Sequence, residues 1–230
     1  MIGRDTEKAE VINTLLNRMP AHVAIVGGGG MGKTTLAVST LHDPAVVEQY
    51  PSRYFISCEG IPSVSTLVGE IASALQIPPT TRDENLINII LSSFHGSTIL
   101  CLDNFETIWD SEAMRLDAEE FLAHLSDLPH LAIMITMRGT QRPSPSRISW
   151  SKPLLPPLQR LTAANSKVIF ERICGPGDEF VERLLGEVDG IPLAITLIGG
   201  MLQEGNETSA ALWGRWKKTH TRAVEIGGKD

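Results

Sequence analysis

The feature that most constrains this sequence is a glycine-rich loop between an apolar segment and the start of a helix. The stretch VAIVGGGGMGKTTLA, residues 23–37, contains Gly27-x-x-x-x-Gly32-Lys33-Thr34. This spacing, with a strand before it and a helix after it, matches the phosphate-binding P-loop. Glycine loses the most conformational entropy on folding, so four in a row need a specific reason. Without Cβ atoms, the backbone N–H groups of the loop can approach a large anion closely. We therefore predict a nucleotide-binding loop here.

The side chains of the loop have distinct expected roles. We expect Lys33 to reach the β- and γ-phosphates, Thr34 to place its hydroxyl on Mg²⁺, and Thr35 to bond the α-phosphate. The alternative is a glycine-rich turn with a chance lysine, which the intact motif in its strand–loop–helix context disfavours. The residues predicted to bind the nucleotide in this loop are Gly29, Gly30, Met31, Gly32, Lys33, Thr34 and Thr35.

The bulk composition excludes several classes of partner. The chain has 230 residues, 42% of them hydrophobic, with a net charge of −7 and a pI near 5.4. With this acidic balance, we expect no binding to nucleic acid or to an anionic membrane surface. The apolar runs are all shorter than the ~20 residues that span a bilayer. Three widely spaced cysteines without metal-ligand spacing suit a reducing compartment, so we expect a cytoplasmic protein.

Short apolar strands alternate with helix-length amphipathic segments, which predicts an α/β fold with a parallel sheet flanked by helices. In the segment of residues 112–128 we expect the pair Glu119–Glu120 on the solvated face of a helix. The predicted strands are Val23–Val26, Tyr54–Ser57, Thr98–Leu102, Leu131–Thr136 and, more weakly, Leu154–Leu158.

After Arg138 the chain passes through a Pro- and Ser-rich loop, and beyond it we predict helices only. We expect a P-loop nucleotide-binding domain over residues 1–155 and a small all-helical domain over residues 156–230. The predicted helices are Ala163–Cys174 with Thr162 as its cap, Asp178–Asp189, Pro192–Gln203 and Ser209–Thr219.

A second motif supports the P-loop. The apolar run in TILCLDNFE delivers Asp103 to the carboxyl end of a strand, where it can hold Mg²⁺ in the Walker B role. Asn104 follows, where vigorous P-loop ATPases often carry a glutamate; asparagine orients water but is a poor proton acceptor. We therefore expect slow hydrolysis, with Glu106 or Asp110 as possible substitutes, although either can equally be a surface acid.

A third motif ends the next strand. In LAIMITMRGT, Thr136 and Arg138 are expected beside the γ-phosphate position. Arg138 can read a third phosphate by charge-assisted hydrogen bonds. The alternative is an arginine that is merely solvated at a strand end. We count Asp103, Asn104 and Arg138 as the candidate catalytic residues, and Thr34 with Asp103 as the metal ligands.

Together these residues resemble the NB-ARC family of STAND-class signal-transduction NTPases, the nucleotide-binding module of NLR-type immune and cell-death proteins. Five blocks occur in the family's order and cover nearly the whole chain. They are IGR at Ile2–Arg4, GGMGKTTLA at Gly29–Ala37, LCLDN at Leu100–Asn104, ITMR at Ile135–Arg138 and GIPLA at Gly190–Ala194.

The resemblance adds roles that the residues alone do not give. It implies that Ile2, Gly3 and Arg4 line the adenine and that Pro192 packs against the nucleotide. Read without the family, Pro192 is simply a favourable residue for the first turn of a helix. The chain ends before the family's winged-helix domain, so a partial module is expected. The segments LDNFET and DGIPLAITLIGGML resemble fungal NLR-like proteins.

Three functions follow as hypotheses. The first is an ATP/ADP switch with slow hydrolysis, whose nucleotide state controls the arrangement of the domains of its parent protein and self-association in the ATP state. The second is an active ATPase of the AAA+ type, such as a loader or remodeller. The third is a scaffold with a permanently bound nucleotide. A GTPase is disfavoured because no NKxD guanine-recognition sequence is present.

Overall fold

The computed structural model describes residues 1–78, 83–144, 146–205 and 207–227. Its chain forms two compact units. The first comprises residues 1, 3–29 and 33–158, and the second comprises residues 2, 30–32 and 159–230. Each unit has its own buried apolar core.

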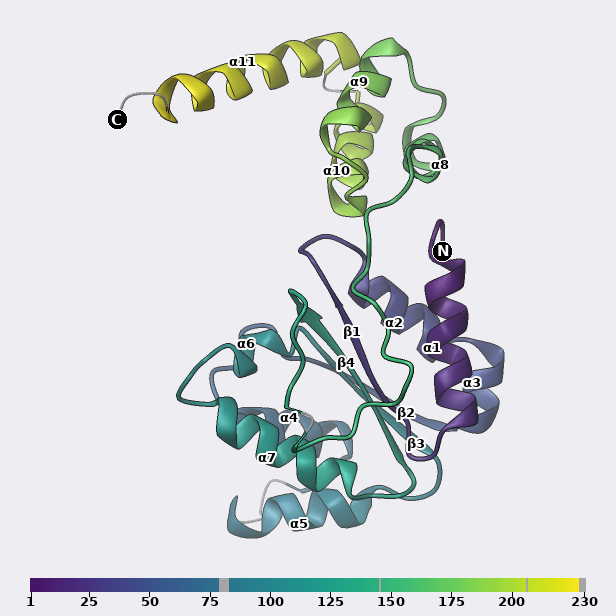
Figure 1. Cartoon of the computed structure of the whole chain (residues 1–230), viewed down its shortest axis with the longest axis vertical. Coiled ribbons are helices and arrows are strands. Elements are labelled where there is room, and N and C mark those ends of the chain that lie inside the picture. Colours follow the sequence, from purple (N-terminus) through teal and green to yellow (C-terminus); the bar gives the residue numbers. More distant parts are fainter. Residues whose placement is uncertain (79–82, 145, 206, 228–230) are drawn as a thin grey trace. The chain divides into compact units, whose positions relative to one another are not determined.

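A four-stranded parallel sheet forms the centre of the first unit (Figure 1). Its spatial order is β1-β4-β3-β2, so β4 lies between the strand of the P-loop and the strand that carries Asp103. In this register Gly27 is opposite Arg138, and Ser57 is opposite Asp103. The motif-bearing strand ends therefore meet at one edge. The strands are β1 His22–Gly27, β2 Ser52–Ser57, β3 Thr98–Asp103 and β4 Leu131–Arg138.

Helices cover both faces of this sheet. On one face α1 and α2 pack on β1, and on the other α4 packs on β2 while α6 and α7 pack on β4 (Figure 1). Strands β1 and β3 are buried along their whole length, which explains their nearly continuous apolar sequences. The helices are α1 Asp5–Asn17, α2 Lys33–Leu41, α3 Pro44–Gln49, α4 Val64–Ala74, α5 Asp83–Ser93, α6 Glu106–Trp109 and α7 Arg115–Ser126.

The predicted α/β fold is confirmed, and the four stronger strand predictions match β1 to β4, each of which is one or two residues longer than predicted. The weaker strand prediction at Leu154–Leu158 is wrong. There the chain makes a single bridge, in which Leu158 N–H donates to Val26 O at 2.8 Å. Pro156 and Pro157 have no N–H to donate, so a ladder cannot extend through them.

The expectation that Glu119 is solvated is also wrong. Its side chain is buried, and Oε1 accepts hydrogen bonds from Trp109 Nε1 at 2.9 Å and from Ser144 N–H at 3.0 Å. Glu120 is exposed, as predicted. The face of α7 that bears Glu119 is covered by α6 and the loop after β4, which the helix periodicity alone does not reveal.

In its described residues, the second unit consists of four helices: α8 Ala163–Cys174, α9 Glu179–Glu187, α10 Pro192–Gln203 and α11 Ser209–Gly227. Thr162 caps α8 by accepting from Asn165 N–H at 3.2 Å, as predicted, and Asp178 caps α9. Phe170, Leu184 and Ile195 lie in the shared core. Among the described residues, no helix combines the length and apolar character needed to cross a bilayer.

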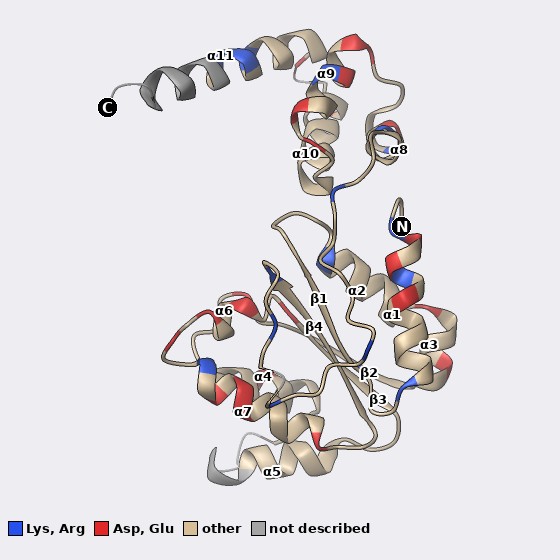
Figure 2. Ribbon diagram, in the orientation of Figure 1, with Lys and Arg blue, Asp and Glu red and all other residues tan. Residues whose placement is uncertain are grey.

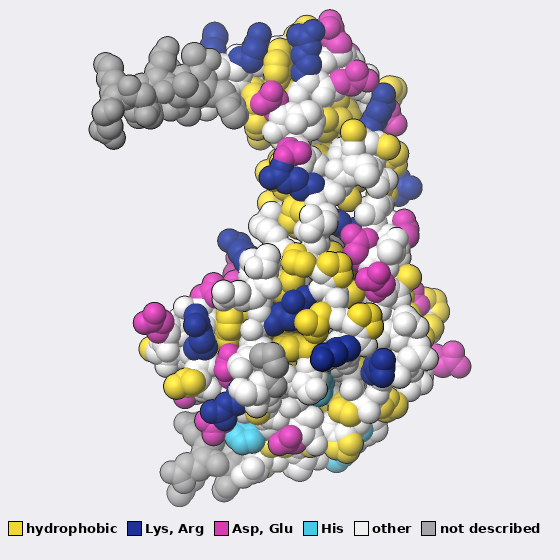
Figure 3. All heavy atoms as spheres, in the orientation of Figure 1, with side chains coloured by type: hydrophobic (Ala, Val, Ile, Leu, Met, Phe, Trp, Pro, Cys, Tyr) yellow, Lys and Arg dark blue, Asp and Glu magenta, His cyan; other side chains and the backbone are white. Residues whose placement is uncertain are grey.

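Charged residues of both signs are interspersed over each unit. Helix α1 carries both acidic and basic residues in its N-terminal half (Figure 2). On the face shown in Figure 3, Lys and Arg atoms lie beside Asp and Glu atoms in both units. This mixed pattern agrees with the modest net charge of −7.

Candidate functional site

The P-loop connects β1 to α2, and its backbone conformation requires glycine. Gly30 and Gly32 have φ values of +71° and +86°, in the left-handed region where a Cβ is unfavourable. Lys33 is the first residue of α2 and is buried to 7% exposure. Thr34 and Thr35 follow in the exposed first turn of the helix.

The Lys33 ammonium is held at the rim of this loop. Nζ donates to Gly27 O at 3.0 Å and to Gly28 O at 2.8 Å, which leaves one of its three protons for another acceptor. Burial lowers the pKa of Lys33, while the Glu106 and Asp103 carboxylates oppose this shift. A partly desolvated cation with a spare donor is suited to a phosphate oxygen.

Two threonine hydroxyls, from α2 and from β4, converge on Asp103 at the end of β3. Thr34 Oγ1, at the start of α2, lies 2.8 Å from Asp103 Oδ1 and 3.0 Å from Oδ2. Thr136 Oγ1, on the neighbouring strand β4, donates to Oδ1 at 2.6 Å. Asp103 is 4% exposed, so these hydroxyls compensate for the desolvation of its carboxylate. The sequence placed Thr136 near the γ-phosphate but gave no sign of its bond to Asp103, which follows from the position of β4 between β1 and β3.

The donors of this cluster fit Mg²⁺. A threonine hydroxyl and a carboxylate within 3.0 Å of each other are hard oxygen ligands of the kind that Mg²⁺ takes together with phosphate oxygens and water. Among the described residues, no group of three or more His, Cys, Asp or Glu side chains could enclose a metal. A magnesium ion here would therefore be held by Thr34, Asp103 and the nucleotide, not by a protein cage.

Asn104 turns the chain sharply after Asp103. Its backbone is left-handed, with φ of 55°, and its N–H donates to Thr136 Oγ1 at 3.0 Å. Asparagine tolerates this conformation better than most residues. The turn brings Glu106, three residues after Asp103, back toward the site.

Glu106 and Arg138 form an ion pair beside this cluster. Arg138 Nε lies 3.2 Å from Glu106 Oε1, although the Arg138 side chain is 70% exposed. Arg138 therefore differs from the freely solvated arginine considered as the alternative. Of the two acids weighed as substitutes for a catalytic glutamate, Glu106 is buried and Asp110 is exposed.

The remaining residues that were predicted to bind nucleotide lie before or at the start of helices. Ile2 and Gly3 precede α1, and Arg4, its N-cap residue, is buried with an ion pair to Glu7 at 2.8 Å. Pro192 is at the first turn of α10 in the second unit, where its missing N–H has no helical partner to lose. Met31 is buried and Gly29 is exposed.

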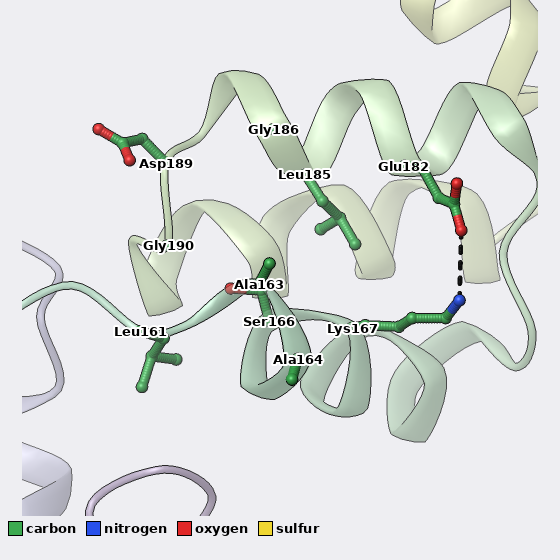
Figure 4. A pocket seen from close by; sticks show the side chains of 10 residues that line it. All are labelled: Leu161, Ala163, Ala164, Ser166, Lys167, Glu182, Leu185, Gly186, Asp189 and Gly190. Carbon is green, nitrogen blue, oxygen red and sulfur yellow. Dashed lines mark hydrogen bonds and ion pairs between the residues drawn. The ribbon is translucent and has the colours of Figure 1, made fainter.

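The second unit contains a pocket of about 450 Å³ between α8 and α9 (Figure 4). Leu185 points into it, and Lys167 faces Glu182 across one end, with Nζ and Oε1 3.2 Å apart. None of the residues predicted to bind nucleotide lines this pocket.

The cysteines add no reactive group to the site. Cys58, Cys101 and Cys174 are all free thiols. Burial raises the pKa of Cys58 to about 12 and raises that of Cys101 well above its ordinary value. The two buried thiols therefore stay protonated and act as small apolar side chains.

The parallel sheet, the P-loop and the Thr34–Asp103 pair define a P-loop NTPase fold. Solved structures share it: the Aeropyrum pernix ORC1 protein in complex with DNA aligns with a TM-score of 0.70 at 15% identity, covering 91% of this chain and 62% of that chain. Cdc6p from Pyrobaculum aerophilum aligns with a TM-score of 0.63 at 14% identity, covering 89% and 63%.

The chain belongs to the NB-ARC family, because the NB-ARC domain matches residues 4–138. A curated relative, the disease resistance protein RGA2 of Solanum bulbocastanum, is 24% identical over 216 residues. That alignment covers 87% of this chain and 22% of RGA2. The chain thus spans about a fifth of the length of this relative.

Proposed function

We propose that this chain is the ATP/ADP-binding switch module of an NLR-like, STAND-class signalling protein that acts in the cytoplasm. The observation that carries the proposal is the convergence of Thr34 and Thr136 on Asp103 beside the Lys33 ammonium. These groups offer a cation, a magnesium position and a spare proton donor to a polyphosphate. Membership in the NB-ARC family and the match to a disease resistance protein support the signalling role.

ATP and ADP differ by the γ-phosphate, so such a switch must bind this group in the ATP state. Lys33, the Asp103-bound Mg²⁺ and Arg138 are the groups that distinguish ATP from ADP in this proposal. Because a ligand shifts an equilibrium only by its differential affinity, these contacts would favour a second domain arrangement and self-association in the ATP state. With Asn104 after Asp103, hydrolysis would be slow and would serve to reset the switch. Segments resembling fungal NLR-like proteins suggest a fungal parent protein.

Calorimetry with Lys33→Ala tests this function. We expect the affinity for ATP and for ADP to fall at least about 100-fold, since a charge-assisted contact to each nucleotide is lost. Lys167→Ala, which removes an exposed lysine of the second unit, should leave both affinities unchanged. If Lys33→Ala bound ATP and ADP with the same affinities as wild type, the proposal would be refuted.

An active ATPase of the AAA+ type is the second candidate. The fold shared with ORC1 and Cdc6p is compatible with it. The two functions differ in turnover: rapid multiple-turnover release of phosphate by the isolated protein would favour the ATPase, and retention of one bound nucleotide would favour the switch.

A further inference from the structure

The Glu106 carboxylate has one fixed oxygen and one that lacks a partner. Oε1 is held by Arg138 Nε at 3.2 Å. Oε2 is buried and has no hydrogen-bond partner among the described residues. The residue as a whole is 8% exposed. A buried carboxylate oxygen without a partner is energetically unfavourable, so this position favours a small donor such as water.

The Glu106 carboxylate lies at the strand ends that carry the phosphate-binding residues. Its partner Arg138 ends β4 and is opposite Gly27, the first residue of the P-loop, in the register of β4 with β1. Lys33 Nζ donates to Gly27 O at 3.0 Å, so the carboxylate lies at the same edge of the sheet as the ammonium that is expected at the β- and γ-phosphates. Two cations, Lys33 and Arg138, flank it, and each has donors available for phosphate oxygens.

The other nearby candidates are less suited to proton transfer. The Asn104 side chain is not a base, and its backbone N–H donates a hydrogen bond to Thr136 Oγ1. Asp110 is exposed at the end of α6. Asp103 accepts hydrogen bonds from two threonine hydroxyls and is assigned to the metal. Glu106 combines burial, a fixed orientation and an unused oxygen.

We propose that Glu106 positions the attacking water and accepts its proton during ATP hydrolysis; this inference rests on the nucleotide-binding function proposed above. The water oxygen forms a bond to the γ-phosphorus while the bond from that phosphorus to the β–γ bridging oxygen breaks. The water proton passes to Glu106 Oε2, and the bridging oxygen leaves with ADP. Arg138 keeps the carboxylate oriented through Oε1.

The test compares Glu106→Gln with Asp110→Asn. The glutamine amide oxygen can still accept a hydrogen bond from Arg138 Nε, so the contact with Arg138 is kept. The amide is far too weak a base to take a proton from water. We expect single-turnover phosphate release by Glu106→Gln to fall about 100-fold, in the range of a lost general base. Its affinities for ATP and ADP should stay within threefold of wild type, and its thermal midpoint should be unchanged. Asp110→Asn should resemble wild type in all of these measurements.

A second readout does not depend on rate. After incubation with ATP and Mg²⁺ and removal of free nucleotide, Glu106→Gln should retain ATP, whereas wild type and Asp110→Asn should retain ADP. Phosphate release by Glu106→Gln within threefold of wild type would overturn the inference. So would a wild type that binds ATP but releases no phosphate, or a parallel loss of affinity and thermal midpoint in Glu106→Gln. Failure of wild type to bind nucleotide would instead reject the proposed function itself.

Discussion

Thr136 on β4 donates its hydroxyl proton to Asp103 on β3 across 2.6 Å, and the same hydroxyl oxygen accepts the Asn104 N–H at 3.0 Å. One side chain of the intervening strand thus orients both the carboxylate and the turn that follows it. This arrangement ties the magnesium position to the internal packing of the sheet.

Thr136→Val should weaken both folding and metal-dependent binding. The substitution keeps the shape but removes the donor to Asp103 and the acceptor for Asn104, so the free energy of unfolding should fall by about 1–3 kcal/mol. Urea denaturation measures this change. Thr136→Ser retains the hydroxyl and should recover most of it. If valine and serine behave alike, the hydrogen bonds have no energetic role.

Thr34→Val should abolish the contribution of Mg²⁺ to ATP binding. Wild type should bind ATP at least about tenfold more tightly with Mg²⁺ than in EDTA, because the ion links Thr34 and Asp103 to the phosphates. In the valine variant the two affinities should converge, while Thr34→Ser should behave as wild type. A magnesium effect of full size in Thr34→Val would place the ion elsewhere.

Glu119→Ala should destabilise the first unit by about 2 kcal/mol or more. It leaves the N–H groups of buried Trp109 and half-buried Ser144 without their acceptor. The adjacent Glu120→Ala removes an exposed acid and should change the free energy of unfolding by less than about 0.5 kcal/mol. Chemical denaturation of both variants provides the comparison, and equal effects would contradict the buried position of Glu119.

Gly190→Ala should destabilise the second unit. Gly190 has φ of +69°, and a Cβ there would lie 2.2 Å from Leu161 O. The left-handed backbone and the overlap together should lower the free energy of unfolding by at least about 2 kcal/mol. Gly186→Ala, in the helix α9 with no neighbour within 4 Å, should instead gain up to about 1 kcal/mol. Thermal unfolding of the two variants tests this contrast.

Acidification should destabilise the protein through His22. Burial lowers the pKa of this imidazole, whose Nδ1 is 3.0 Å from Ser149 O. The unfolded chain therefore binds the proton more readily, and stability falls as the pH drops below the ordinary histidine value of about 6.5 until it passes the lowered one. His22→Asn, which keeps a donor to Ser149, should lose less stability between pH 7.5 and 5.5. Urea denaturation at both pH values measures the difference.

The P-loop and its sheet were predictable because the relevant signals are local. Nearly continuous apolar runs, which the sheet buries, predict β1, β3 and β4, and the glycine spacing predicts the loop. The sequence could not separate Glu106 from Asp110, since both follow Asp103 within one short segment. Glu106 is buried and Asp110 is exposed because of the left-handed turn at Asn104, which a hydrophobic periodicity does not reveal.

The two wrong predictions have different origins. Glu119 occupies a polar position of an amphipathic pattern, yet α6 and the loop before Ile148 cover that side of α7. The fifth strand failed because Pro156 and Pro157 interrupt an otherwise apolar run. Tertiary packing thus decides the burial of Glu119, whereas the proline pair that ends the ladder is visible in the local sequence.

The backbone of Asn104 has an evolutionary consequence. A glutamate introduced there would meet a φ of 55°, a conformation that costs an ordinary side chain about 1–2 kcal/mol. A glutamate at this position would therefore lower folding stability at the same time as it changed the chemistry of the site. Selection for or against turnover would act more easily on the acid two positions further along.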